Sequence, residues 1–204
     1  MSKSRKVPLL VLLIWVALLL ELVSAIYLKN WITVLVTTAT LALTVLTIVF
    51  KDRFEIKLPT RFAAAIVVFV FATLFLGEVK DFYERFWWWD AILHGFSALA
   101  FGLLDFVCIF MLFDGDRFAA PPIAIAFLSF CVAVSVGAVW EVFEFAMDQL
   151  FGLNMQKSGL VDTMWDLIVD CLGAFTGAFA GYIYLKSGEG TLAGWIEDFV
   201  GQNR

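Results

Sequence analysis

The chain has 204 residues, of which 62% are apolar, 17% aromatic and only 16% charged. Soluble domains are about 45–50% apolar, so this composition excludes an ordinary soluble domain and indicates a polytopic membrane protein with no nucleic-acid partner. The net charge of -5 says little by itself, because the charges are unevenly distributed along the chain. The three cysteines lie in apolar runs without metal-ligand spacing, so we expect them to be small core residues rather than a disulfide framework. They are Cys108, Cys131 and Cys171.

Six apolar runs are each long enough to cross a bilayer, which requires about 20 helical residues. We therefore predict an all-α fold, a membrane bundle of six transmembrane helices. The predicted helices cover residues 7–28, 31–50, 61–77, 90–113, 122–150 and 163–185. The first run resembles a signal peptide in its basic start, but its length and its Glu21 favour a retained helix.

The chain divides into a six-helix transmembrane domain, residues 1–186, and a cytoplasmic tail, residues 187–204. In the tail, Leu192, Trp195, Ile196 and Phe199 are spaced to share one helical face. This pattern predicts an amphipathic helix at the membrane surface, with docking to a partner as the alternative.

The basic residues predict that both termini are cytoplasmic. Ten of them then lie inside, against four in the outer loops, as the positive-inside rule requires. The inner set is Lys3, Arg5, Lys6, Lys51, Arg53, Lys57, Arg61, Arg117, Lys186 and Arg204, and the outer set is Lys29, Lys80, Arg85 and Lys157. In this orientation residues 86–89, Phe-Trp-Trp-Trp, form an interfacial aromatic anchor, with substrate binding as the alternative role.

Acidic residues and the single histidine form stripes on the last three predicted helices. The stripes are Asp90 and His94, then Glu141, Glu144 and Asp148, then Asp162, Asp166 and Asp170. Spacings of three and four residues put the members of each stripe on one helical face. At 1.5 Å per residue, all of these residues lie within about 13 Å of the outer ends of their helices.

Neighbouring small residues indicate that these stripes face the bundle interior. On the last helix the stripe continues through Gly173, Gly177 and Gly181. Such small-residue runs allow close helix packing in membranes. We therefore predict one shared pocket, in which carboxylates without a lysine or arginine partner require protons, cations or water.

The residues nearest the helix ends have a simpler interpretation. Asp90, Asp148 and Asp162 are close enough to water to serve as caps, and Asp162 stands where an N-cap of the last helix is expected. His94 alone could be a hydrogen-bonded core histidine, but acids at its depth on two other helices favour a functional role.

Two segments of the second half carry a family resemblance. One is Trp140-Glu141-Val142-Phe143-Glu144-Phe145, and the other is Trp165-Asp166-x3-Asp170 followed by a glycine-rich helix. With Asp90-x3-His94, they resemble the YjdF-like (DUF2238) family of uncharacterised bacterial inner-membrane proteins, and more distantly VanZ-like membrane proteins. The resemblance implies a multi-pass protein of the bacterial inner (plasma) membrane and a candidate site, but no reaction.

Oxygen ligands with one imidazole suit Mg²⁺, Mn²⁺ or Ca²⁺ better than Zn²⁺ or Fe. We predict a divalent metal site whose ligands come from His94, Glu141, Glu144, Asp166, Asp170 and Asp90. Glu141, Glu144 and His94 are the candidate catalytic residues. A metal in the outer half of the bilayer could activate water or bind a phosphoryl group, so the predicted partner is a membrane lipid or lipid-linked small molecule.

Two other functions stay open from the sequence. Asp105 lies on the His94 face about 16 Å deeper, so Asp90, His94 and Asp105 could relay protons or cations in a transporter. Against this, the chain shows no internal repeat and no proline-broken helix pair. Alternatively, the metal could be a structural staple in a membrane subunit, and a homo-oligomer also stays open.

Overall fold

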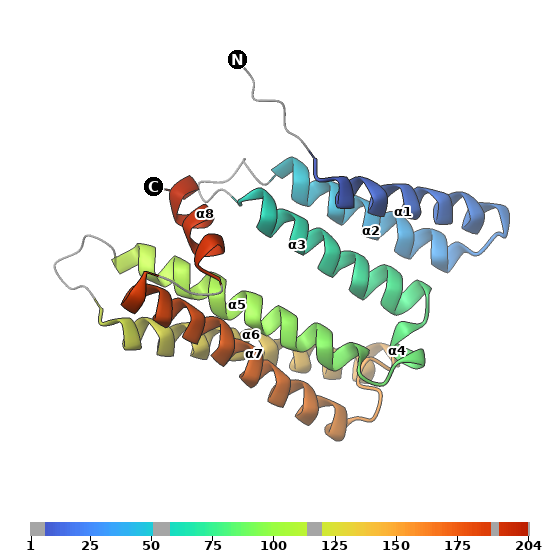
Figure 1. Cartoon of the computed structure of the whole chain (residues 1–204). Helices are drawn as coiled ribbons and strands as arrows, with labels where there is room; N and C mark the ends of the chain where they lie inside the picture. The colour runs from blue at the N-terminus through green and yellow to red at the C-terminus, as the bar shows by residue number, and fades with distance from the viewer. Residues whose placement is uncertain (1–6, 51–57, 114–119, 189–191, 204) are drawn as a thin grey trace, which may run out of the picture. The chain divides into compact units, whose positions relative to one another are not determined.

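The computed structural model describes residues 7–50, 58–113, 120–188 and 192–203, and the regular elements in these ranges are helices (Figure 1). Most of the basic residues used to orient the chain lie outside the described residues, so the orientation stays a prediction. These are Lys3, Arg5, Lys6, Lys51, Arg53, Lys57, Arg117 and Arg204.

Six of the described helical stretches are long and apolar enough to cross a membrane. They are α1 (Leu9–Tyr27), α2 (Trp31–Phe50), α3 with the π-helix η1 (Thr60–Val70 and Phe71–Val79), α5 (Trp89–Phe113), α6 (Pro122–Phe151) and α7 (Leu160–Ser187). Their bounds lie within three residues of the predicted ones, which confirms the six-span all-α bundle. The structure adds α4 (Phe82–Arg85) and the tail helix α8 (Ala193–Asn203).

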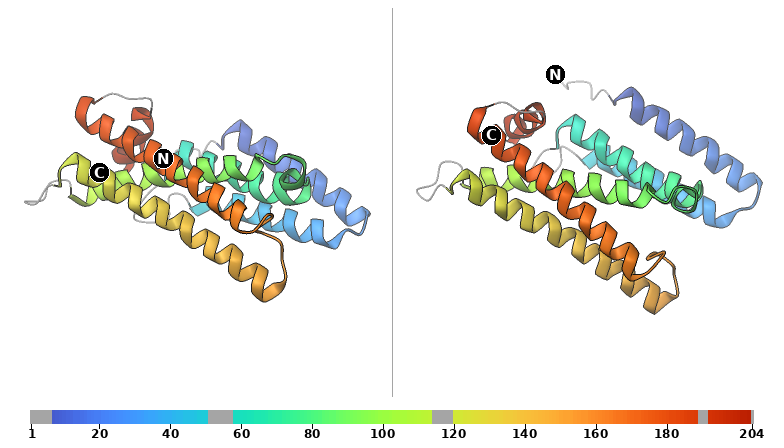
Figure 2. Two further views of the ribbon diagram at one scale, coloured as in Figure 1. Left: turned by 90° about the horizontal axis from the view of Figure 1, so that it is seen from below. Right: turned by 60° about the horizontal axis from the view of Figure 1, so that its bottom comes forward.

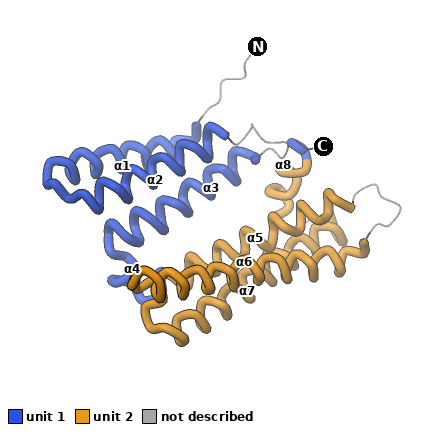
Figure 3. The backbone as a smooth tube through the Cα atoms, turned by 180° about the vertical axis from the view of Figure 1, so that it is seen from behind, with its two compact units in different colours: residues 1–89, 201–204 blue, residues 90–200 orange. Residues whose placement is uncertain are grey.

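The chain forms two compact units, residues 1–89 with 201–204 and residues 90–200 (Figure 3). The first unit contains α1 to α4 and has an aliphatic and aromatic core that includes Val11, Leu18, Val67 and Phe75. In this unit Lys80 Nζ, in the turn after η1, pairs with Glu21 Oε2 of α1 at 2.8 Å. Glu21 in the first span is thereby neutralised.

The aromatic segment at the end of this unit is exposed. Trp87 is 90% exposed, and Phe82 packs edge-on against both Phe86 and Trp89 at centroid distances of 5.0 and 4.9 Å. Interfacial anchoring and substrate binding both remain predictions for these rings.

The second unit contains α5, α6 and α7, which lie side by side in all three ribbon views (Figures 1 and 2). Its core is built from small residues, including Ala98, Ala133 and Ala174. Pro121 and Pro122 start α6, where a missing backbone N–H costs nothing, and Gly152 ends it with φ 66°.

Close backbone contact joins α5 to α7. A Cβ at Gly177 would overlap the Leu99 carbonyl oxygen, and a Cβ at Gly102 would lie 3.1 Å from Ala174 Cα. The small-residue stripe of α7 therefore packs against α5, as its spacing predicts.

The tail helix α8 buries its apolar face. Ile196 and Phe199 are each 1% exposed, so this face packs against the protein. A role of α8 at the membrane surface stays a prediction.

Candidate metal centre

The polar cluster lies within the second unit, on the faces that α5, α6 and α7 turn toward one another. His94, Glu141, Glu144, Asp166 and Asp170 are all buried, with between 1% and 7% of their surface exposed. The structure thus brings together five of the six predicted metal-site residues at full burial. The sixth, Asp90, lies in the first turn of α5 with a half-buried side chain that is 24% exposed.

His94 stands at the centre of the cluster. Its Nδ1 lies 3.3 Å from both carboxylate oxygens of Asp170. Its Nε2 lies 3.7 Å from Glu141 Oε1 and 4.0 Å from Asp90 Oδ1. Side chains from all three helices therefore meet at one imidazole ring.

Asp90, His94 and Asp166 come together closely enough to share an ion. One potential ligand atom from each lies within 4.8 Å of the other two. Oxygen ligands lie about 2.0–2.6 Å from Mg²⁺ or Ca²⁺, so ligands on opposite sides of one ion are about 4–5 Å apart. The observed spacing fits a small divalent cation without rearrangement of the helices.

Several buried carboxylate oxygens have no hydrogen-bond partner among the described residues. They are Glu141 Oε1 and Oε2, Glu144 Oε2 and Asp166 Oδ2. The Thr163 hydroxyl accepts a hydrogen bond from Gln156 Nε2 at 2.6 Å, and its own proton remains available to interact with Glu141, which lies close to it. Buried polar atoms are rarely left unpaired, so this set is the strongest sign of a bound group.

The excess of negative charge in the cluster also indicates a bound cation or bound protons. Within α5, α6 and α7 the only lysine or arginine is Lys186, about 24 Å along α7 from Asp170 at 1.5 Å per residue. Five ionised carboxyl groups and one imidazolium would leave four negative charges in a buried site. Protons or a cation must supply the remaining neutralisation.

Glu144 is held differently from the other acids. Trp140 Nε1 donates to Glu144 Oε1 at 2.9 Å, while Oε2 stays unpaired. Glu144 also lies within electrostatic reach of Glu141, Asp90 and His94. Trp140 was not among the predicted site residues, although its spacing of four residues from Glu144 puts both on one helical face.

Two rim acids flank the loop between α6 and α7, Asp148 near the end of α6 and Asp162 near the start of α7. Asp148 accepts hydrogen bonds from the backbone N–H groups of Met155 at 2.7 Å and Gln156 at 2.9 Å, so it fixes the loop that follows α6. The predicted N-cap role of Asp162 is wrong, because α7 begins at Leu160 and its N-cap is Gly159 with φ 67°. Since this glycine turn starts the helix earlier, Asp162 falls in its first turn, near Lys157.

Asp105, the deeper acid of α5, lies outside the cluster. It is half-buried, and its Oδ2 has no hydrogen-bond partner among the described residues. Among the described residues, no hydrogen bond therefore connects Asp105 Oδ2 to His94.

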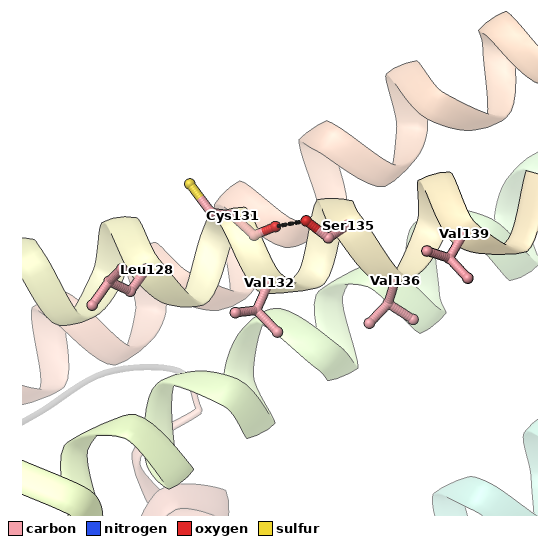
Figure 4. Close-up of a pocket in the computed structure, with 6 residues that line it drawn as sticks. All are labelled: Leu128, Cys131, Val132, Ser135, Val136 and Val139. Atoms are coloured by element: carbon pink, nitrogen blue, oxygen red, sulfur yellow. Dashed lines mark hydrogen bonds between the residues drawn. The ribbon is translucent and has the colours of Figure 1, made fainter.

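A shallow groove on α6 is separate from the cluster (Figure 4). It is lined by Leu128, Cys131, Val132, Ser135, Val136 and Val139. Ser135 Oγ donates to the Cys131 carbonyl at 2.7 Å, so its hydroxyl is already used within the helix. At 100° per residue this stripe lies opposite the face that carries Glu141 and Glu144. It is an apolar helix surface without ion-binding groups.

Comparison with known proteins identifies the family. The family described as predicted membrane protein (DUF2238) matches residues 8–187, which includes all six spans and every cluster residue. The chain belongs to the DUF2238 family. An uncharacterised protein of Thermotoga maritima is 30% identical over 130 residues, an alignment that covers 64% of this chain and 65% of that protein. The chain thus spans just under two thirds of that relative.

No solved structure matches this DUF2238 protein. The family assignment confirms the resemblance drawn from the Trp-Glu and Trp-Asp segments, while the VanZ-like similarity stays a prediction. The family description carries no reaction, so function must be argued from the cluster itself.

Proposed function

We propose that this DUF2238 protein binds a divalent cation among His94, Asp90, Asp166 and Glu141 and uses it as a membrane enzyme. The observation that carries the proposal is the set of buried carboxylate oxygens around His94 that have no hydrogen-bond partner in the described part of the chain. A divalent cation would offset two of the four negative charges and coordinate several of these oxygens at once, whereas a proton pairs only one oxygen. Oxygen-rich ligands favour Mg²⁺, Mn²⁺ or Ca²⁺ over Zn²⁺ or Fe.

The donor set fits such an ion. Asp90, Asp166 and Glu141 contribute hard oxygen atoms, and His94 Nε2 faces two of these three carboxylates. A bound cation supplies a Lewis acid that polarises a phosphoryl or carbonyl oxygen of the substrate. Glu144 is the candidate general base, because Trp140 fixes one of its oxygens while the other is free to accept a proton from water.

The proposed substrate is a membrane lipid or a lipid-linked small molecule. At 1.5 Å per residue, the five buried residues lie about 8 to 15 Å along their helices from one common end and Asp90 about 2 Å, so a group held near the lipid headgroups would reach them. In the orientation predicted from the basic residues this is the outer leaflet of the bacterial inner membrane.

The experiment measures cation-dependent release of phosphate from phospholipids and polyprenyl phosphates by the purified protein in lipid. We expect turnover with Mg²⁺ or Mn²⁺, loss with chelator, and a loss of about 10²–10⁴-fold for Glu144→Gln, the range expected for a missing general base. Asp148→Glu, at a loop contact outside the cluster, is the control that should remain active.

Transport is the second candidate, supported by Asp105 deeper on the helix that carries His94, whose buried Oδ2 has no hydrogen-bond partner among the residues that the structure describes. If no lipid phosphate is released while proteoliposomes show cation or proton flux that Asp105→Asn abolishes, the enzyme proposal is contradicted and the transporter replaces it.

A further inference from the structure

The two ring nitrogens of His94 face different surroundings. Nδ1 lies 3.3 Å from each Asp170 oxygen and faces that one carboxylate. Nε2 points toward Glu141 and Asp90, at 3.7 and 4.0 Å. Nδ1 of the ring thus contacts Asp170 alone, whereas Nε2 faces two acids, Glu141 and Asp90.

Asp170 also differs from its neighbours in how it is satisfied. Both its oxygens contact His94, whereas Asp166, one turn earlier on α7, keeps a buried Oδ2 without a partner among the described residues. Asp170 is 1% exposed and therefore has no access to water. Its two oxygens share the one proton that Nδ1 of the imidazole can offer.

Gly137 of α6 provides the space for this side chain. A Cβ at position 137 would overlap Asp170 Oδ2 and lie 2.8 Å from Asp170 Cγ. The backbone of α6 therefore restricts where the Asp170 carboxylate can lie, and so restricts the orientation of the ring that it contacts.

We infer that Asp170 is a positioning residue that keeps the proton of His94 on Nδ1 and directs Nε2 at the cation. An ionised carboxylate only accepts hydrogen bonds, so its contact with Nδ1 requires a proton there and leaves the lone pair on Nε2. Carboxylate partners of this kind orient metal-binding histidines in many proteins. This inference rests on the proposed cation site. Asp170, predicted from the sequence to be a metal ligand, would instead orient the ligand His94.

The single histidine of this chain makes the inference directly measurable. Protein labelled with ¹⁵N-histidine gives signals from one imidazole ring only, and loading with ¹¹³Cd²⁺ identifies the bound nitrogen by its coupling. We expect a proton on Nδ1 and cadmium coupling on Nε2. In Asp170→Asn we expect Nδ1 to lose its fixed proton and cadmium affinity to fall about 10–100-fold, the usual cost of losing such a partner.

Asp166→Asn is the matched control, because it removes a proposed ligand but leaves the Asp170 contact. It should weaken cadmium binding while the proton stays on Nδ1. Gly137→Ala supplies a second variant if Asp170→Asn does not fold, and it should disturb the Nδ1 proton without removing any acid.

Cadmium coupling on Nδ1, or a ring proton pattern unchanged in both Asp170→Asn and Gly137→Ala, would overturn the inference. If the native protein binds no cation, the proposed function fails instead. The role of Asp170 is then decided by the ring protons of the cation-free protein: a proton fixed on Nδ1 and released in Asp170→Asn supports positioning, and any other pattern contradicts it.

Discussion

The Trp140 side chain is partly exposed on the surface of the bundle, while its ring N–H reaches into the cluster. The residue is 47% exposed, yet its Nε1 donates to Glu144, which is 6% exposed. It closes the cluster on that side and supplies the one hydrogen bond that Glu144 receives from the described residues. Removal of this donor leaves a buried carboxyl group with both oxygens unpaired.

For Trp140→Phe we therefore expect a loss of about 1–3 kcal/mol in the free energy of unfolding, the cost of an unsatisfied buried polar atom. Thermal unfolding in detergent with a chelator present measures it. Trp165→Phe is the matched control, since Trp165 is 61% exposed and belongs to the same bundle. Equal stability losses in the two variants would show that the hydrogen bond to Glu144 contributes nothing.

Residue spacing alone predicted which acids share a face and a depth, because helix geometry is local. It did not predict which acid contacts His94, since that choice depends on how closely α6 and α7 approach. Gly137 decides it, by leaving room for Asp170 between the helices. A contact set by an interhelical distance cannot be read from one helix at a time.

At the level of helices, the packing of α5 on α7 depends on glycine. A Cβ at Gly177 would overlap the Leu99 carbonyl oxygen and lie 2.8 Å from Leu103 N, both backbone atoms that cannot rotate away. The α5–α7 contact holds His94 beside Asp170, so the site depends on it.

Gly177→Ala should lower the free energy of unfolding by about 1–3 kcal/mol or more, the range for overpacking a tight core. Gly95→Ala is the control, because its nearest neighbour is Val169 Cβ at 4.0 Å and alanine favours helix by about 1 kcal/mol over glycine. If Gly95→Ala is as unstable as Gly177→Ala in thermal unfolding, close α5–α7 packing is not the cause.

Hydropathy and length predicted the spans because each helix must cross about 30 Å of hydrocarbon. They did not predict the π-helix η1, in which Thr73 Oγ1 donates to the Phe69 carbonyl at 3.0 Å. They also missed α4, which starts after Asp81 at φ 57°. Both features change backbone hydrogen bonding without changing hydrophobicity, so a hydropathy pattern contains no signal for them.

At the scale of the whole molecule, the main feature is an excess of buried negative charge in the second unit. Its buried acids gather around His94, while its one helical lysine, Lys186, lies at the opposite end of α7. A folded membrane protein with such a site needs a cation or several bound protons in every copy. A bound divalent cation is the form that we propose.

Elemental analysis of the purified protein tests that claim most directly, with native protein, Asp166→Asn and the control Asp105→Asn prepared in parallel without chelator. We predict about one divalent cation per chain in the native protein and in Asp105→Asn, and a clear loss in Asp166→Asn with the helical content unchanged. Native protein that contains no stoichiometric cation, and that gains none on dialysis against Mg²⁺, Mn²⁺ or Ca²⁺, would contradict a cation site around His94.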